Sequence, residues 1–98
     1  MSGSAILDEL WNVISDRATK APDNSYTAKI LTHRKGIDKS LEKVGEEATE
    51  YIIAVKNGNH DAITSEAADL LFHFLISLKA AGVEVSQVYR ELEERRKP

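Results

Sequence analysis

Apolar residues recur at helical spacing along most of this chain of 98 residues, and the longest such stripe constrains the fold most. Intervals of three and four residues place side chains on one face of an α-helix. The stripe stops at Asn57-Gly58-Asn59, where Gly58 suits the left-handed conformation that ends many helices. We therefore predict a long helix with one apolar side, formed by Ile37, Leu41, Val44, Ala48, Ile52 and Val55.

A second long stripe follows the same turn and runs to Gly82. A link this short folds two consecutive helices back on each other, so the two long helices are predicted to form an antiparallel hairpin. The apolar side of the second helix consists of Ile63, Ala67, Leu70, Leu71, Phe74, Leu75 and Leu78.

Shorter helices are predicted on either side of the hairpin. A first helix runs from Ile6 to the breaker cluster at residues 20–25, a short helix or ordered loop covers 26–34, and Ser86 or a neighbour opens a last helix. No segment shows the sustained alternation of a β-strand. The predicted fold class is all-α, with residues 1–98 in a single domain.

Composition narrows the classes of function. One core of this size is only marginally able to stabilise a domain, so a second copy of the chain is a natural partner. The net charge of -3 argues against binding to nucleic acid or to an anionic membrane. The absence of cysteine excludes disulfides and thiolate chemistry. Without a signal-like N-terminus or a membrane-length apolar run, the chain is expected to be soluble and cytoplasmic.

Two pairs of carboxylates stand inside the predicted long helices: Glu47 with Glu50, and Glu66 with Asp69. Residues three apart are neighbours on a helix, so each pair brings like charges together. Glu50 lies eight residues before Gly58 and Glu66 eight residues after it, which places the pairs at comparable height on facing helices. A hard divalent cation such as Mg²⁺ would offset the repulsion, since it prefers carboxylate and phosphate oxygens.

Two structural explanations of the same carboxylates stay open at this point. They can be solvated residues of an acidic surface, or they can belong to a salt-bridge network with Lys39 and Lys43. Apolar neighbours such as Ala48 and Leu70 put the carboxylates at the border of the core, where charged groups need partners. This surrounding favours a binding site over a purely solvated face.

A helical wheel extends the acidic cluster into a candidate polyphosphate site. Basic groups close to carboxylates suit such a site, because metals bind some phosphate oxygens and ammonium groups neutralise others. His73, one turn after Asp69, is expected either to contact substrate phosphate or to be a hydrogen-bonded histidine at the core edge. The shared sector of the first long helix contains Lys39, Lys43, Glu46, Glu47 and Glu50, and that of the second contains Glu66, Asp69, His73 and Ser77.

Gly45 interrupts the first long helix at a cost of about 1 kcal/mol relative to alanine, so its presence calls for a reason. Close approach of a substrate or of another chain segment is one reason. A tight crossing of two helices is the other, and it carries no functional meaning.

The acidic pairs and the segments around them resemble the phosphoribosyl-ATP pyrophosphohydrolases, which belong to the MazG-type all-α nucleotide pyrophosphohydrolases. The resemblance covers nearly the whole chain. It implies a homodimeric helix bundle that hydrolyses phosphoribosyl-ATP to phosphoribosyl-AMP and pyrophosphate with Mg²⁺, the second step of histidine biosynthesis. The segments that carry it are Ser25-Tyr26-Thr27-Ala28-Lys29, Lys43-Val44-Gly45-Glu46-Glu47-Ala48-Thr49-Glu50, Glu66-Ala67-Ala68-Asp69-Leu70-Leu71-Phe72-His73 and Val88-Tyr89-Arg90-Glu91-Leu92.

Together, the residues and the resemblance predict a set of roles. Mg²⁺ is expected to bind the four signature carboxylates, Glu47, Glu50, Glu66 and Asp69. The catalytic residues are expected to be Glu46, Glu47 and Glu50, with Glu46 as a further metal ligand or as the base that orients water. Substrate phosphates are expected to contact Lys29, Lys39, Lys43 and His73.

Two competing functions remain open. A MazG-type enzyme that hydrolyses free nucleoside triphosphates shares the acidic signature but is expected to lack the segment Ser25-Tyr26-Thr27-Ala28-Lys29. A non-catalytic helical dimerisation module would show no Mg²⁺-dependent activity. It would also lose little stability, or gain some, when the clustered carboxylates are neutralised.

Overall fold

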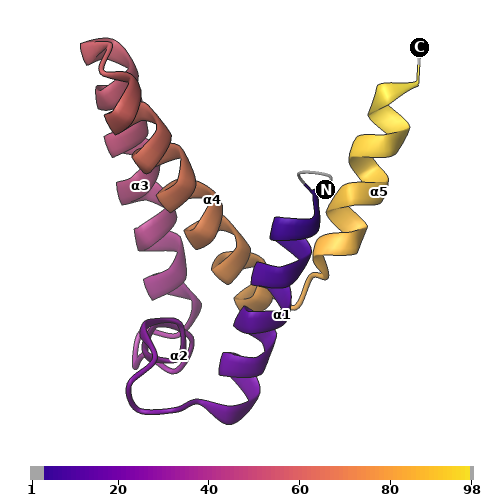
Figure 1. Ribbon diagram of the computed structural model, residues 1–98. Helices are drawn as coiled ribbons and strands as arrows, with labels where there is room; N and C mark the ends of the chain where they lie inside the picture. The colour runs from indigo at the N-terminus through magenta and orange to yellow at the C-terminus, as the bar shows by residue number, and fades with distance from the viewer. Residues whose placement is uncertain (1–3, 98) are drawn as a thin grey trace.

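The computed structural model describes residues 4–97, and in that range the chain forms helices and no strand (Figure 1). The predicted all-α class is confirmed. In chain order the helices are α1 (Ser4–Lys20), α2 (Tyr26–Leu31), α3 (Ile37–Asn57), α4 (His60–Ala81) and α5 (Val85–Arg96).

Helices α3 and α4 form the predicted antiparallel hairpin (Figure 1). Gly58 takes the left-handed conformation at φ 74°, and its N–H donates to the carbonyls of Ala54 and Val55. Asn59 then caps α4, because its side-chain oxygen accepts a hydrogen bond of 3.0 Å from the N–H of Ala62. The two long helices therefore reverse direction within two residues.

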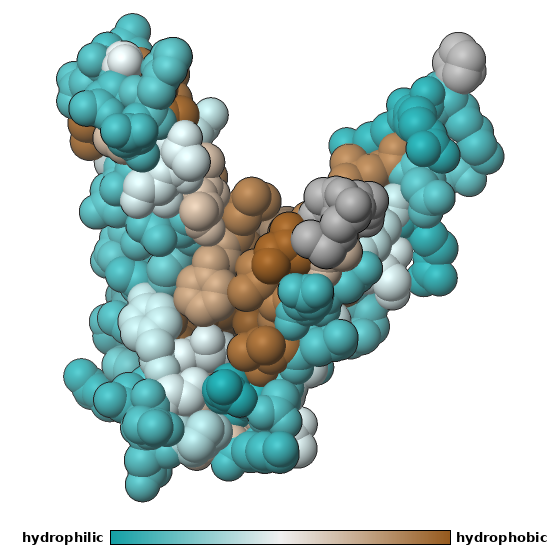
Figure 2. All heavy atoms as spheres, viewed as in Figure 1, coloured by the Kyte–Doolittle hydropathy of each residue, from teal (hydrophilic) through white to brown (hydrophobic). Residues whose placement is uncertain are grey.

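The core lies at the end of the hairpin away from Gly58, where α1 and α2 pack against α4 (Figures 1 and 2). Figure 2 shows apolar side chains gathered in the angle between the hairpin and α1. The buried core residues are Trp11, Ile14, Ile30, Leu75, Ile76 and Val85.

Both of the shorter segments predicted after the first helix form helices. The connector forms helix α2, whose first turn is capped by Ser25 through a hydrogen bond of 3.1 Å from the N–H of Ala28 to Oγ. Helix α5 has Glu84 as its N-cap, two residues before Ser86. Gln87 stabilises this earlier start, because its side-chain oxygen accepts a hydrogen bond of 2.9 Å from the N–H of Glu84.

The apolar stripe of α3 forms as predicted, but much of it is exposed in the single chain. Ile52 is 59% exposed, and Leu41 and Val55 are also exposed. Beside it, between α3 and α4, lies an apolar hollow of about 450 Å³, lined by Tyr51, Ala67, Leu70, Leu71 and Phe74. None of the described helices has the length and apolarity needed to cross a membrane.

Candidate active site

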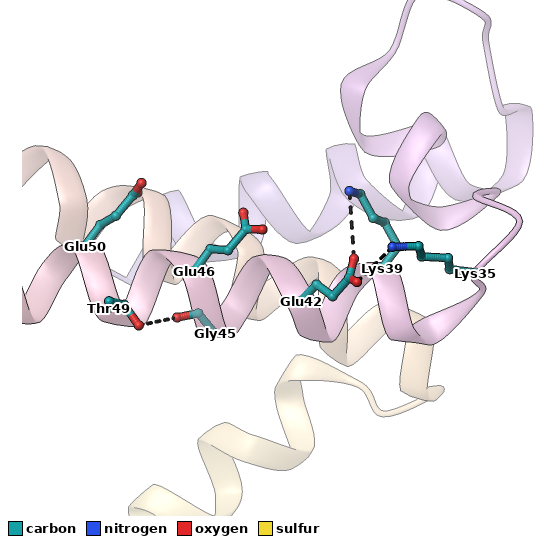
Figure 3. Close-up of a pocket in the computed structure, with 7 residues that line it drawn as sticks. All are labelled: Lys35, Lys39, Glu42, Gly45, Glu46, Thr49 and Glu50. Carbon is teal, nitrogen blue, oxygen red and sulfur yellow. Dashed lines mark hydrogen bonds and ion pairs between the residues drawn. The ribbon is translucent and has the colours of Figure 1, made fainter.

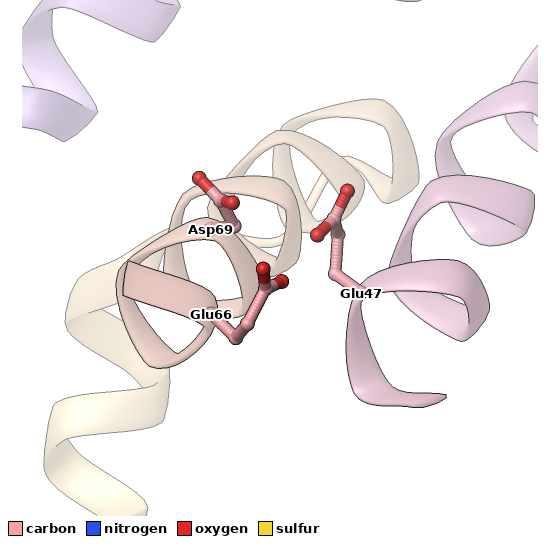
Figure 4. A group of neighbouring side chains, drawn as sticks. All are labelled: Glu47, Glu66 and Asp69. Carbon is pink, nitrogen blue, oxygen red and sulfur yellow. The ribbon is translucent and has the colours of Figure 1, made fainter. Parts of the chain in front are cut away.

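Three of the four signature carboxylates converge between α3 and α4. Glu47 points from α3 toward Glu66 and Asp69 on α4 (Figure 4). One carboxylate oxygen from each residue lies within 4.8 Å of the other two. The hairpin causes this convergence, since it holds the acidic turns of both helices at the same height.

Burial sets the electrostatics of this group. Glu47 is only 7% exposed, and Glu66 is partly buried. Burial raises the pKa of Glu47, the negative charges of Glu50 and Asp69 raise it further, and Lys43 acts in the opposite direction. The pKa of Glu66 is raised by partial desolvation and by the charges of Glu50 and Asp69. Both groups are therefore poorly compensated as carboxylates.

Two carboxylate oxygens in the group lack a partner. Oε2 of Glu47 and Oε2 of Glu66 are buried without a hydrogen bond to any described residue. A buried carboxylate oxygen without a donor is costly, and a cation is the partner that would satisfy both atoms together. The donor set is oxygen only, which fits a hard divalent ion such as Mg²⁺.

The salt-bridge alternative accounts for only part of this arrangement. Lys43 Nζ lies 3.0 Å from a carboxylate oxygen of Glu46 but 3.8 Å from Glu47. Lys39 is paired with Glu42 at 3.9 Å. Neither lysine contacts Glu66, so the described ion pairs leave the centre of the cluster uncompensated.

Glu46 and Glu50 lie at the outer side of the cluster and are exposed. Glu46 accepts a hydrogen bond of 3.0 Å from Lys43, and this bond is the largest cause of a raised pKa for that lysine. Glu50 lies outside the group of three but close enough for its charge to act on Glu47 and Glu66. Their catalytic and metal-binding roles stay predictions.

A broad hollow of about 830 Å³ runs along the outer face of α3 and includes Glu50 (Figure 3). Gly45 forms part of its lining, and a Cβ added there would meet no described atom within 4 Å outside the backbone of its own helix. No tight crossing between helices of the single chain therefore accounts for Gly45. The lining residues are Lys35, Lys39, Glu42, Gly45, Glu46, Thr49 and Glu50.

His73 is buried and both of its ring nitrogens are engaged. Nδ1 lies 2.8 Å from the backbone carbonyl of Asp69, and Nε2 lies 2.7 Å from the hydroxyl of Tyr26. Because a carbonyl only accepts, Nδ1 carries the proton in the neutral ring, and Tyr26 donates to Nε2. His73 thus matches the expected core-edge histidine, and its contact with substrate phosphate stays a prediction.

The remaining predicted substrate lysine, Lys29, is exposed on α2, and its role also stays a prediction. Tyr26, Lys35 and Glu42 were not predicted as site residues. The spacing of Lys39 and Glu42, three residues apart on one helix, was a readable signal for an ion pair. The contact of Tyr26 with His73 had no such signal, because it joins residues 47 apart in the sequence.

Comparison with known proteins gives a consistent result over nearly the whole chain. Residues 7–96 match the family model described as phosphoribosyl-ATP pyrophosphohydrolase. A phosphoribosyl-ATP pyrophosphatase of Methanosphaerula palustris is 58% identical over 97 residues, which cover 99% of this chain and 98% of that protein. The protein of the same name from Methanoregula boonei is 59% identical over 92 residues, covering 94% and 88%. That of Trichlorobacter lovleyi is 49% identical over 94 residues, covering 96% and 85%.

Proposed function

Since the chain belongs to the phosphoribosyl-ATP pyrophosphohydrolase family, we propose that it hydrolyses phosphoribosyl-ATP to phosphoribosyl-AMP and pyrophosphate with Mg²⁺, in the second step of histidine biosynthesis. One observation in the structure carries the assignment best. Glu47, Glu66 and Asp69 bring their oxygens within 4.8 Å of one another, and two of the oxygens in this group lack a hydrogen-bond partner among the described residues.

The metal would be held by Glu47, Glu66 and Asp69, with Glu50 as the fourth carboxylate. When bound, Mg²⁺ lowers the pKa of a coordinated water and neutralises charge on the triphosphate. The burial of Glu47 and the like charges around it, which Lys43 offsets only in part, would then be compensated by the cation.

The protein's own groups supply the remaining steps. Glu46 is an exposed carboxylate beside the cluster, and it orients the attacking water and accepts its proton. The water oxygen forms a new bond to phosphorus while the P–O bond that bridges the α and β phosphates breaks, and pyrophosphate leaves from phosphoribosyl-AMP. Lys43, whose pKa is raised first by its hydrogen bond with Glu46 and also by the charges of Glu46 and Glu47, stays protonated and neutralises charge on the phosphate oxygens.

His73 positions Tyr26 at the edge of this site. The hydrogen bond between them fixes α2 against α4. Lys29 on α2 and Lys39 in the first turn of α3 are assigned to other phosphate groups of the substrate.

A homodimer is part of the proposal. The apolar stripe of α3 and the apolar hollow beside it continue across both arms of the hairpin. A second hairpin laid over this face would bury Ile52, Leu71 and Phe74, and pairing of the hairpins would give a helix bundle.

The direct test is release of pyrophosphate by the purified protein from phosphoribosyl-ATP, measured beside ATP and a panel of deoxynucleoside triphosphates. Each substrate is assayed with Mg²⁺ and with chelator. Selective release from phosphoribosyl-ATP that stops with chelator is expected. Release from free triphosphates alone would assign the chain to the wider MazG-type activity, and release from none would favour a helical dimerisation module.

A further inference from the structure

Lys35 and Lys39 converge on a single carboxylate at one end of the hollow on α3. Lys35 Nζ lies 2.9 Å from Glu42, and Lys39 Nζ lies 3.9 Å from the other oxygen of the same side chain (Figure 3). Two ammonium groups and one carboxylate leave an excess positive charge here. Phosphate is the kind of anion that paired lysines bind, because it offers several oxygens at once.

The opposite end of the same hollow borders the carboxylate cluster. Glu50 lines the hollow, and its charge raises the pKa of both Glu47 and Glu66. Lys39 and Glu50 are eleven residues apart on α3, so about 16 Å of helix separates the basic end from the acidic end. Glu46 and Glu50 project to the same side as Lys39 in Figure 3, so one ligand can extend along this face.

Phosphoribosyl-ATP carries anions at two separate ends. Its triphosphate is attached to one ribose of the adenosine, and a second ribose on the purine carries a monophosphate. A site for this substrate therefore needs a cationic group at some distance from the metal-binding carboxylates. A free nucleoside triphosphate lacks the second phosphate and makes no such demand.

We propose that Lys35 and Lys39 form the subsite for the ribose-linked monophosphate of the substrate, at the far end of the hollow from the metal-binding carboxylates. This assignment rests on the proposed function. It adds a reason for the enzyme to prefer phosphoribosyl-ATP to free nucleoside triphosphates, which lack the second phosphate. Gly45 lines the same hollow, and a Cβ added there would meet no described atom within 4 Å outside the backbone of its own helix, so there is room for the purine and its ribose beside this part of α3.

Glu42 is a competitor in this subsite. It pairs with both lysines in the unliganded chain, so the incoming phosphate has to replace its carboxylate. Because both lysines and Glu42 are partly open to solvent, this exchange needs no rearrangement of the helix. Neutralising Glu42 removes this competition for Lys35 and Lys39 and strengthens binding of the substrate's monophosphate.

The test compares two substrates that differ only in that phosphate: phosphoribosyl-ATP and N1-ribosyl-ATP. The measured quantity is the ratio of kcat/KM for the first to kcat/KM for the second, in Mg²⁺. In the wild type this ratio is expected to be about tenfold or more, as for a charge-assisted contact to phosphate. It should fall close to one in the double variant Lys35→Ala/Lys39→Ala and rise in Glu42→Gln.

The matched control is Lys56→Ala, which removes an exposed lysine from the other end of α3 and should keep the wild-type ratio. A double variant that keeps the wild-type ratio while it still hydrolyses phosphoribosyl-ATP would overturn the subsite and leave the proposed function standing. Wild-type protein that hydrolyses neither substrate would overturn the proposed function, and the subsite with it.

Discussion

The hydroxyl of Tyr26 lies 2.7 Å from Nε2 of His73 and joins α2 to the middle of α4. The same histidine is fixed on its other side by the backbone carbonyl of Asp69, at 2.8 Å. A residue of the carboxylate cluster thus anchors the ring that receives Tyr26. Through this chain of two hydrogen bonds, the position of α2 depends on the helix that presents Glu66 and Asp69.

Replacing Tyr26 with phenylalanine should lower the free energy of unfolding by about 1–3 kcal/mol, because Nε2 of the buried His73 loses its donor. Urea denaturation measures the change. The matched control is Tyr51→Phe, since the hydroxyl of Tyr51 makes no hydrogen bond to another described side chain, and it should change stability far less. Equal losses in the two variants would contradict a specific role for the bond.

Glu47→Gln should stabilise the metal-free protein at neutral pH. The folded chain raises the pKa of Glu47 above its ordinary value of 4.5. At pH values around and between the ordinary and the raised pKa, the folded state therefore binds more protons than the unfolded state, and stability falls as pH rises. The gain of the variant over the wild type, measured by denaturation in chelator, should therefore grow from pH 4 to pH 7. An exposed counterpart on α5, Glu93→Gln, should show no such growth. A gain for Glu47→Gln that is independent of pH would contradict this reading.

Mg²⁺ should raise the thermal midpoint of the wild type, and this effect should be about half as large in Asp69→Asn. A ligand at 100 times its dissociation constant stabilises by about 2.7 kcal/mol, and a tenfold weaker site loses about 1.4 kcal/mol of it. Asp61→Asn removes an acidic residue from the first turn of the same helix, so it serves as the control and should respond to Mg²⁺ like the wild type. An undiminished shift in Asp69→Asn would remove this residue from the metal site.

Gly45→Ala should separate stability from activity. Alanine in the interior of α3 should raise the free energy of unfolding by about 0.5–1 kcal/mol, since no neighbouring side chain obstructs the added Cβ. The same methyl group enters the hollow, so kcat/KM for phosphoribosyl-ATP should fall. Thermal denaturation and pyrophosphate release on one preparation give both quantities. An alanine variant with unchanged kcat/KM would show that substrate does not lie over this part of α3.

Ile52→Lys should convert a dimer to a monomer, because it places a charge in the exposed apolar stripe of α3. Sedimentation equilibrium at several concentrations measures the change. Ile53→Lys is a closely matched control: Ile53 is 53% exposed against 59% for Ile52, but it points about 100° further around the helix. Dissociation by both variants, or by neither, would contradict a dimer interface on this stripe.

The helices and the hairpin were predictable because their signals are local. Apolar spacing identifies the faces of α3 and α4, and Gly58 marks the reversal between them without reference to the rest of the fold. The start of α5 was predicted to within one residue, since the helix begins at Val85 beside Ser86, but its cap at Glu84 and Gln87 was not predicted. Both cap positions are compatible with the same apolar spacing.

The sequence did not predict which apolar residues are buried in the single chain or how the outer residues of the site are placed, for physical reasons. An apolar stripe identifies a face but not what covers it, and in the single chain Leu41 and Ile52 stay exposed. Convergence of the carboxylates followed from their equal distance to Gly58. The contact of Lys35 with Glu42 spans the turn at Gly36, whose φ is 63°, and the apolar spacing carries no signal for the path of such a turn.

The equal arms of the hairpin also restrict how such a chain can change length. Glu50 and Glu66 each stand eight residues from Gly58, so one residue inserted into one arm rotates that helix by about 100° and turns its carboxylates away from the other pair. Residues added in the turn between α3 and α4 are tolerable, because the two helices keep their positions relative to each other. Length variation among proteins built this way should therefore be concentrated at the turn and at the two ends, while the spacing within each acidic turn stays constant.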